Sequence, residues 1–355
     1  MHKHKAEGVI PQYLLKKLAN EGNEKAKESI VRTKEILKKR MDKPIKRERD
    51  VTISSAQPVR DHNPDRHIYD CEHTESRRKK LARSEGDPAT NDDDVNRAYD
   101  FSGICLDYFK NVLNRNSIDN LGMDLIFNVN YGENFLNAFW DPNRQEMVFG
   151  DGDGKTFLSF TRSLDVIAHE KAHGITEYTN NLEYAQQSGA LNEHFSDVIG
   201  SAVKQHAKRE SADSADWLIG NEIVGPEFGG IALRSLKEPG TAFTNDPQPN
   251  HMSKYKDLPV NEDGDYGGVH INSGIPNKAF FLVSMEIGTD NAAILWYNAW
   301  NNREYLHRHA QFKDAFEAIL KTAQTLSSQG MMPYNTEEAV KRAFSEVGIY
   351  SLVGV

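Results

Sequence analysis

Hydrophobic and polar positions follow two patterns along the chain. Short apolar runs at 125–131 and 146–150 are bounded by turn residues, which is typical of β-strands. Residues 92–114 have helical spacing, and after about residue 185 the chain is mostly helical. Its last helix is expected to begin after an Asn335 cap and to end before Gly348. A β-rich first half before a helical second half predicts an α+β fold in two lobes.

The amino-terminal segment has a pattern of its own. Residues 10–18, Ile-Pro-Gln-Tyr-Leu-Leu-Lys-Lys-Leu, indicate a short docking segment. Asn23 is expected to cap a helix that runs through Arg40. Residues 41–66, with three prolines and many charges, indicate an exposed linker, which is where a protease would cut.

Composition narrows the class of protein. The chain has 355 residues, 38% of them hydrophobic, and its mean hydropathy is -0.66. No apolar run approaches the roughly 18 residues of a spanning helix, so no membrane association is expected. Cys71 and Cys105 are too few for a disulfide framework or a Cys-based zinc module. They could form one bridge, but two free thiols are favoured. The polar start shows no ordinary signal peptide, which leaves cytoplasmic residence or a nonstandard export route.

Charge is divided unevenly along the chain. Residues 1–50 carry 15 Lys and Arg against 8 Asp and Glu, whereas the remainder carries 28 against 44. A basic arm and an acidic body are expected to attract each other. A nucleic-acid tail is the weaker alternative, because Glu is interleaved with the basic residues and no aromatic stacking pattern accompanies them. No nucleic-acid partner is therefore expected.

The sharpest chemical signal is His169-Glu-Lys-Ala-His173. On a helix, this i, i+4 spacing places two imidazoles on one face, with their Cβ atoms about 5–6 Å apart, which suits a single zinc ion. Glu170 lies beside the first histidine and can reach a water molecule at the metal without binding the metal itself. The alternative is a helix that carries two surface histidines.

A zinc site needs a third protein ligand and one open position. About twenty residues beyond His173, Glu193 lies in a helical stretch with Asn192 beside it and Asp197 one turn further on. Asp197 can accept the free N–H of a ligand histidine, and Asn192 is placed in the same supporting shell. The alternative is a solvated helix face. The neighbouring residues are apolar, which indicates that these polar groups border a buried surface and need partners. These apolar neighbours are Ala190, Leu191, Phe195, Val198 and Ile199.

These segments resemble the thermolysin family of zinc endopeptidases, and more narrowly its protealysin-like branch with a short propeptide. The similarity runs from about residue 67 to the end, in family order. The matching segments, besides the two histidines, are Asn137-Ala-Phe-Trp, Gly150-Asp-Gly-Asp-Gly154, Gly189-Ala-Leu-Asn-Glu193, Asp216-Trp-Leu-Ile-Gly, Ala232-Leu-Arg-Ser-Leu and Gly267-Gly-Val-His-Ile-Asn-Ser-Gly274.

The resemblance implies a zinc-dependent endopeptidase that is made as a zymogen. His169, His173 and Glu193 match the zinc ligands, and Glu170 matches the general base that activates water. The resemblance further implies an oxyanion-stabilising His270 with Tyr184 beside it, an Asp265 that orients His270, and groups that hold the substrate chain: Asn137, the backbone of Ala138, and Arg234. Taken alone, His270 is equally well a turn histidine.

Specificity is expected from a set of apolar side chains. They match positions that line the pocket for the residue just after the cut: Phe157, Phe160, Val166, Ile219, Ile223 and Leu233. All six are apolar, so the resemblance implies cleavage before bulky hydrophobic residues. Ordinary core packing is the alternative for several of them.

Lys171 departs from the family pattern, which usually has an apolar residue there. A lysine at this position must reach solvent or find a carboxylate, because an unpaired buried ammonium costs several kcal/mol. It motivates a second hypothesis, a zinc-binding but catalytically weak interaction or inhibitory protein. His194, next to Glu193, is either a spare metal contact or a packing residue.

The sequence also lacks several of the residues that bind the paired calcium ions in the family. Asp165 and Asp216 match two acidic ligands of its paired calcium site, but Lys204, Leu218 and Asn221 cannot supply carboxylates. Lys204 could instead place its charge near the two aspartates. No paired calcium site is therefore expected, and a single calcium ion elsewhere stays open.

The expected organisation has four parts. Residues 1–50 form a basic propeptide and 51–66 a linker with the processing site. Residues 67–185 form the catalytic lobe, and 186–355 the helical lobe. The propeptide motif has one proline, Pro11, where the branch usually has two adjacent ones. The expected partners are peptide and protein substrates, with the propeptide as an intramolecular inhibitor.

Overall fold

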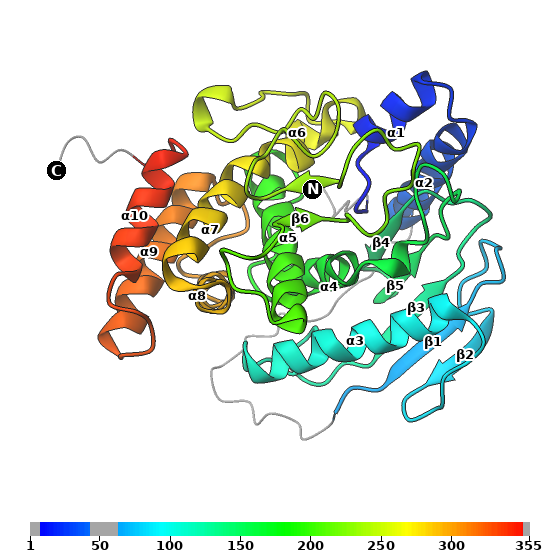
Figure 1. Ribbon diagram of the computed structural model, residues 1–355, viewed down its shortest axis with the longest axis horizontal. Helices are drawn as coiled ribbons and strands as arrows, with labels where there is room; N and C mark the ends of the chain where they lie inside the picture. Colours follow the sequence, from blue (N-terminus) through cyan, green and yellow to red (C-terminus); the bar gives the residue numbers. More distant parts are fainter. Residues whose placement is uncertain (1–7, 43–62, 351–355) are drawn as a thin grey trace.

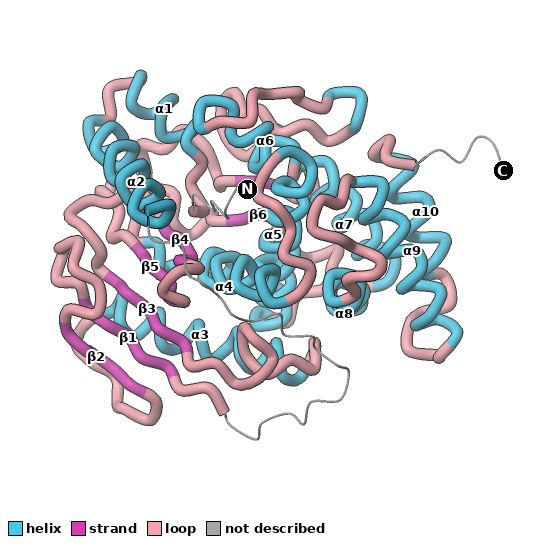
Figure 2. The backbone as a smooth tube through the Cα atoms, turned by 180° about the vertical axis from the view of Figure 1, so that it is seen from behind, coloured by secondary structure: helices cyan, strands magenta, loops and turns pink. Residues whose placement is uncertain are grey.

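The amino-terminal lobe is built on a five-stranded sheet with the order β2-β1-β3-β5-β4. A computed structural model describes residues 8–42 and 63–350 of the chain (Figure 1). β1 is parallel to β3 and β3 to β5, whereas β2 and β4 pair antiparallel at the two edges. The strands lie side by side in Figure 2. The strands are β1 (Arg66–Asp70), β2 (Lys80–Ser84), β3 (Leu125–Val129), β4 (Ala138–Asp141) and β5 (Glu146–Phe149).

The strands expected at 125–131 and 146–150 are confirmed as β3 and β5. The helix expected at 92–114 is confirmed as α3 (Asp93–Asn111), which packs on β1 and β3. Asp92 begins it by accepting hydrogen bonds from the backbone N–H groups of Asp94 and Val95. β1 and β2 escaped the pattern analysis because their sequences, Arg-His-Ile-Tyr-Asp and Lys-Leu-Ala-Arg-Ser, are largely polar.

The carboxy-terminal lobe is mainly helical, as expected. Two short strands, β6 (Leu218–Ile219) and β7 (Arg234–Ser235), pair antiparallel. None of the helices in the described ranges has the length and apolar composition needed to cross a membrane. The helices are α5 (Gln186–Lys208), α6 (Asp265–Asn272), α7 (Gly274–Ile287), α8 (Thr289–Asn301), α9 (Phe312–Ser328) and α10 (Thr336–Glu346), with single turns η1 (Phe160–Arg162), η2 (Met252–Lys254) and η3 (Glu262–Gly264).

The last helix begins and ends where the pattern predicted, but the capping prediction at Asn335 is wrong. Asn335 makes no side-chain capping bond and instead donates from Nδ2 to the carbonyl of Glu286, 3.5 Å away. Its backbone has φ -87° and ψ 2°, whereas a capping residue is usually extended. Gly348 follows the helix at φ 76°, a conformation that suits glycine.

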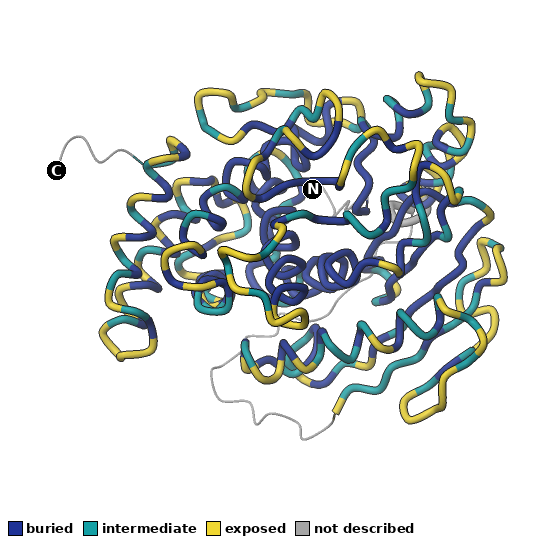
Figure 3. The backbone as a smooth tube through the Cα atoms, viewed as in Figure 1, coloured by how far each residue is buried: buried dark blue, intermediate teal, exposed yellow. Residues whose placement is uncertain are grey.

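α4 (Leu164–Tyr178) and α5 pack against each other in the centre of the molecule, where most of their residues are buried (Figure 3). Gly200 of α5 permits the close approach, because a Cβ atom there would lie 2.7 Å from the carbonyl oxygen of Asp165. These two central helices carry the candidate metal ligands. Cys71 and Cys105 are buried and both are free, which confirms the expectation of free thiols.

The amino-terminal arm forms α1 (Gln12–Asn20) and α2 (Glu24–Asp42), which pack against each other, and α1 also packs against η3. Asn23 caps α2 by accepting from the N–H of Ala26 at 2.9 Å, as predicted. Opposite charges join the arm to the body: Lys34 lies 3.6 Å from Glu262, and Lys16 pairs with Asp263. The predicted linker falls largely in 43–62, outside the described residues.

Candidate active site

Three predicted ligands converge where α4 meets α5. His169 and His173 come from α4 and Glu193 from α5, and one ligand atom of each lies within 4.8 Å of the others. The Nε2 atoms of the histidines are 3.1 Å apart, and each lies 3.5 Å from an oxygen of Glu193. All three residues are buried. Two consecutive helices therefore present two imidazoles and a carboxylate to one point.

The histidines are oriented by the residues predicted to support them. His169 Nδ1 lies 2.9 Å from Asp197 Oδ1, and His173 Nδ1 lies 2.8 Å from Asn192 Oδ1. Both acceptors are oxygens, so each ring donates from Nδ1 and leaves the lone pair of Nε2 facing Glu193.

These three side chains fit a zinc ion. The set of two imidazole nitrogens and one carboxylate is typical of catalytic zinc, which keeps a further position open. Glu193 Oε2 is buried and has no hydrogen-bond partner, a costly state that a cation would relieve. Burial alone would raise the pKa of Glu193, but His270 and His173 outweigh it and hold that pKa well below its usual value. Glu193 is therefore an anion ready to bind a cation.

Glu170 is fully buried beside the first ligand histidine, and its Oε2 accepts a hydrogen bond from the backbone N–H of Trp140 at 2.7 Å. Trp140 belongs to edge strand β4, so the sheet fixes the carboxylate of the zinc helix. This role of Trp140 could not be predicted from the sequence, because a backbone N–H carries no signal in the identity of its residue.

His270 enters the site from α6 with Asp265 behind it. Asp265 Oδ1 lies 2.6 Å from His270 Nδ1, and Oδ2 accepts from the backbone N–H groups of His270 and Ile271. The chain folds back through residues with positive φ, including Gly267 and Gly268, which lets the carboxylate reach the histidine. Burial alone would lower the pKa of His270, but the carboxylates of Glu193 and Asp265 raise it to about 9. These two carboxylates therefore favour the protonated form of His270.

Tyr184 lies on the other side of His270. Its hydroxyl is 3.2 Å from His270 Nε2 and donates to Glu193 Oε1. The ring is buried together with Tyr266 and Val269. The two predicted oxyanion donors are therefore adjacent to the metal ligands.

Arg234 lies on β7 and forms a bidentate pair with one carboxylate. Its Nε and Nη2 donate to Asp197 at 2.8 Å each, in a bidentate pair buried on both sides. Burial alone would raise the pKa of Asp197, but Arg234 and His169 hold it well below its usual range. Asp197 thus connects a metal ligand to the predicted substrate-binding arginine.

A stretch of peptide from the arm already occupies this cleft. Val9 donates to the carbonyl of Ala138 at 3.0 Å, and Ile10 exchanges two hydrogen bonds of 3.0 and 3.1 Å with the side chain of Asn137. Arg234 Nη1 donates to the carbonyl of Val9 at 3.2 Å. The arm therefore hydrogen-bonds along edge strand β4 through the groups predicted to align a substrate.

The six predicted pocket residues are all buried, most of them at zero exposure: Phe157, Phe160, Val166, Ile219, Ile223 and Leu233. Ile219 pairs with Arg234 across β6 and β7, which places this apolar group beside the arginine. The rings of Phe157 and Phe160 lie 5.8 Å apart.

Lys171 contradicts the expectation that it reaches solvent or a carboxylate. It is fully buried, its Nζ donates to the backbone carbonyl of Ser102 on α3 at 3.0 Å, and it lies 5.3 Å from the ring centre of Phe127. A backbone carbonyl and an aromatic face replace the expected carboxylate. The side chain therefore points to α3 and β3 rather than to the metal ligands.

Replacing Lys171 by Met is expected to raise the free energy of unfolding by about 1–4 kcal/mol at pH 7. Burial lowers the pKa of Lys171 from 10.5 to about 8. Below pH 8 the folded state must hold the buried charge. Between pH 8 and 10.5 the folded chain loses this proton before the unfolded chain does, so wild-type stability recovers and the advantage of Met shrinks.

Urea unfolding at pH 7 and at pH 9.5, in a Glu170→Gln background to prevent self-digestion, measures the two differences. Lys313→Met on the exposed face of α9 is the matched control, since the Lys313 side chain is 77% exposed. An equal gain for Lys171→Met at both pH values would contradict the explanation.

Lys204 and His194 both find partners away from the metal ligands. Lys204 Nζ lies 3.0 Å from both Asp165 Oδ2 and Asp216 Oδ1, as the sequence suggested. His194 hydrogen-bonds Asn277 and is buried against aromatic rings, so its ring nitrogens are not directed to the metal ligands.

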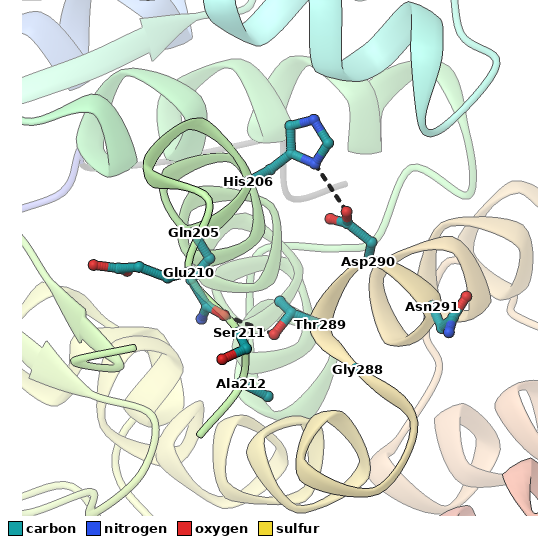
Figure 4. A pocket seen from close by; sticks show the side chains of 9 residues that line it. All are labelled: Gln205, His206, Glu210, Ser211, Ala212, Gly288, Thr289, Asp290 and Asn291. Carbon is teal, nitrogen blue, oxygen red and sulfur yellow. Dashed lines mark hydrogen bonds and ion pairs between the residues drawn. The ribbon is translucent and has the colours of Figure 1, made fainter. Parts of the chain in front are cut away.

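A separate pocket lies between the end of α5 and the start of α8 (Figure 4). Two side-chain pairs line it: His206 Nδ1 lies 2.8 Å from Asp290 Oδ2, and Thr289 donates to Gln205 at 2.6 Å. None of the predicted site residues lines this pocket, so it is separate from the candidate active site.

Comparison with known proteins agrees with the fold and the site. The model of the thermolysin metallopeptidase catalytic domain matches residues 49–177, and that of the thermolysin metallopeptidase alpha-helical domain matches residues 180–349. Protease PrtS of Photorhabdus sp. (strain Az29) is 39% identical over 351 residues, which cover 96% of this chain and 92% of that protein. An extracellular metalloprotease of Pectobacterium carotovorum subsp. carotovorum is 41% identical over 302 residues, covering 82% and 83%.

Among solved structures, the precursor of protealysin, a metalloproteinase from Serratia proteamaculans, matches with a TM-score of 0.82 and 36% identity, covering 97% of this chain and 100% of that one. A two-lobed α+β fold around a His-His-Glu cluster places the protein among the zinc-dependent metalloendopeptidases. Within that class the chain belongs to the thermolysin family, and it is protealysin-like.

Proposed function

We propose that this metalloendopeptidase hydrolyses peptide bonds on the amino-terminal side of bulky hydrophobic residues and is held inactive by its own arm. One observation carries the proposal: a peptide backbone at Val9 and Ile10 lies in the cleft on Asn137, Ala138 and Arg234. The groups that hold this segment are backbone and side-chain donors and acceptors that suit any extended peptide.

Peptide hydrolysis needs a nucleophile, stabilisation of an oxyanion and a proton for the leaving amine. Zinc, when bound by His169, His173 and Glu193, polarises the carbonyl and lowers the pKa of a water molecule to about 7. Glu170, anchored by the sheet, takes the proton from this water and returns it to the amine. His270 and Tyr184 donate hydrogen bonds to the developing oxyanion.

The supporting residues have separate roles. Asp265 keeps His270 oriented and protonated, while Asn192 and Asp197 hold the ligand histidines in place. Arg234 donates to the carbonyl of the residue after the cut, and Asn137 aligns the following residue, by analogy with Val9 and Ile10 of the arm.

The arm is proposed to act as an intramolecular inhibitor that is cleaved off. In this division, residues 1–50 are the propeptide, 51–66 contain the processing site, 67–185 form the catalytic lobe and 186–355 the helical lobe. Support comes from the contacts of the arm with both lobes: Asn23 donates to Thr156 at 2.6 Å in one, and Lys34 approaches Glu262 in the other.

The alternative of a catalytically weak zinc-binding protein rested on Lys171. The Lys171 ammonium donates to the carbonyl of Ser102 on α3, so its contacts do not obstruct Glu170 or the zinc ligands. We therefore propose an active enzyme rather than a catalytically weak zinc-binding protein.

Specificity is tested with peptides that differ only in the residue after the cut. Leu or Phe there is expected to give a kcat/KM at least about 100-fold above Asp, because an apolar pocket cannot pair a buried carboxylate. Mass spectrometry of the products locates the cut. Peptides with the same exchange six residues away serve as controls. Similar rates for Leu and Asp after the cut would refute the proposed specificity.

A further inference from the structure

Four buried residues of the helical lobe form a chain of hydrogen bonds that ends at Asp197. Trp296 Nε1 donates to His194 Nε2 at 2.7 Å, and His194 Nδ1 lies 2.7 Å from Asn277 Oδ1. Asn277 Nδ2 donates to Asp197 Oδ2 at 2.9 Å. Every member is at most 1% exposed. The chain crosses from α8 through α5 and α7, and returns to α5.

The direction of every bond in this chain is determined by its first member. The indole N–H of Trp296 can only donate, so Nε2 of His194 must accept and the ring proton must lie on Nδ1. His194 then donates to Asn277, which presents its carbonyl oxygen to the ring. The amide N–H₂ of Asn277 is thereby turned toward Asp197, where it can only donate.

Asp197 receives four donors with its two oxygens. Oδ1 accepts from His169 and from Arg234 Nη2, and Oδ2 accepts from Arg234 Nε and from Asn277. A carboxylate has about four lone-pair positions, so this one is saturated and its plane is determined. Asn277 supplies the single contact that belongs to neither the metal ligand nor the arginine.

We propose that Asn277 and His194 are positioning residues: by orienting the Asp197 carboxylate they set the geometry of a zinc ligand and of the substrate-binding arginine together. The proposal rests on the proposed roles of His169 and Arg234. Neither Asn277 nor His194 needs to touch metal or substrate, because both act through the shared carboxylate.

The test compares Asn277→Leu and Asn277→Asp. Leu removes the donor at similar volume, whereas Asp keeps the shape and turns a second carboxylate toward Asp197. Zinc affinity of the full chain, measured by competition with a chelator, is expected to fall about 10-fold for Leu. For Asp we expect a larger loss, on the order of 100-fold, since like charges repel in a buried site. KM for a peptide substrate is expected to rise for both variants, and more for Asp than for Leu.

Asn128 of β3 provides the matched control. It is also fully buried, donating from Nδ2 to the carbonyl of Met147 and accepting at Oδ1 from the N–H of Arg78. Asn128→Leu and Asn128→Asp should lower the midpoint of thermal unfolding of the zinc-free protein but leave zinc affinity and KM at wild-type values. Asn277 variants that lose only thermal stability, as this control does, would overturn the proposal.

A milder variant tests the first hydrogen bond of this chain, from Trp296 to His194. Trp296→Phe keeps an aromatic ring, although a smaller one, and removes the donor that determines the His194 tautomer. A loss of zinc affinity of a few-fold, smaller than for Asn277→Leu, is expected; no loss beside a clear effect of Asn277→Leu would overturn the role of His194. The affinity measurement needs no turnover, so it stands even if the proposed peptide cleavage fails.

Discussion

Glu170→Gln is expected to lower kcat for peptide hydrolysis by about 1000-fold while one zinc ion per chain stays bound. Gln keeps the size of Glu and its hydrogen bond from the N–H of Trp140, but it cannot accept a proton from water or pass one to the leaving amine. The ligands His169, His173 and Glu193 are untouched, so the affinity for zinc should change little. Rates on a fluorogenic peptide and elemental analysis of the same samples measure both quantities.

Glu177→Gln is the matched control for this substitution. Glu177 lies two turns further along the same helix and also contacts Trp140, accepting from its indole N–H at 3.3 Å. It lies outside the metal cluster, so the neutral variant should keep kcat within about threefold. Full activity of Glu170→Gln with zinc bound would remove the assigned base and with it the proposed mechanism.

Gly8→Ala is expected to raise the activity of the unprocessed chain at least about 10-fold. Gly8 has φ +109°, and a Cβ atom there would lie 2.2 Å from the carbonyl oxygen of Ala138, at the point where the arm enters the cleft. Relief of that overlap requires Val9 and Ile10 to leave the strand edge. A change in docking free energy of 1.4 kcal/mol already corresponds to a tenfold change in the released fraction.

The control for the arm is Gly22→Ala. Gly22 also has a positive φ, +101°, but a Cβ atom there meets nothing within 4 Å. Both substitutions strain the arm, and only Gly8→Ala disturbs the cleft. Initial rates are measured on chains that mass spectrometry shows to be intact, so that processing does not contribute. Equal activity of the two variants would show that Val9 and Ile10 do not block the site.

Much of the candidate site could be predicted because its chemistry depends on spacing along the chain. His169 and His173, at i and i+4, share one face of a helix, with Glu170 directly beside the first of them, and Glu193 and Asp197 share one face of the next helix. Strands β3 and β5 and helix α3 were predictable for a similar reason, since their apolar residues recur at the period of the element.

Other features left no pattern along the chain. β1 and β2 have polar sequences and exist because they pair with β3 and with each other. The prediction for Lys171 was wrong because it assumed that only solvent or a carboxylate could be the partner of the ammonium. In the structure, the backbone carbonyl of Ser102 on a different helix accepts its hydrogen bond.

The sequence alone determined which residues carry the chemistry: the ligand histidines, their glutamate partner on a second helix, the base between them, and a basic segment ahead of an acidic body. Only the tertiary structure decided what surrounds them. The hydrogen bond that anchors Glu170, the saturation of Asp197 by Asn277, and the seating of Val9 in the cleft join residues 30, 80 and more than 125 positions apart. Local periodicity acts within a few turns of chain, whereas such contacts are selected by the packing of whole helices and strands.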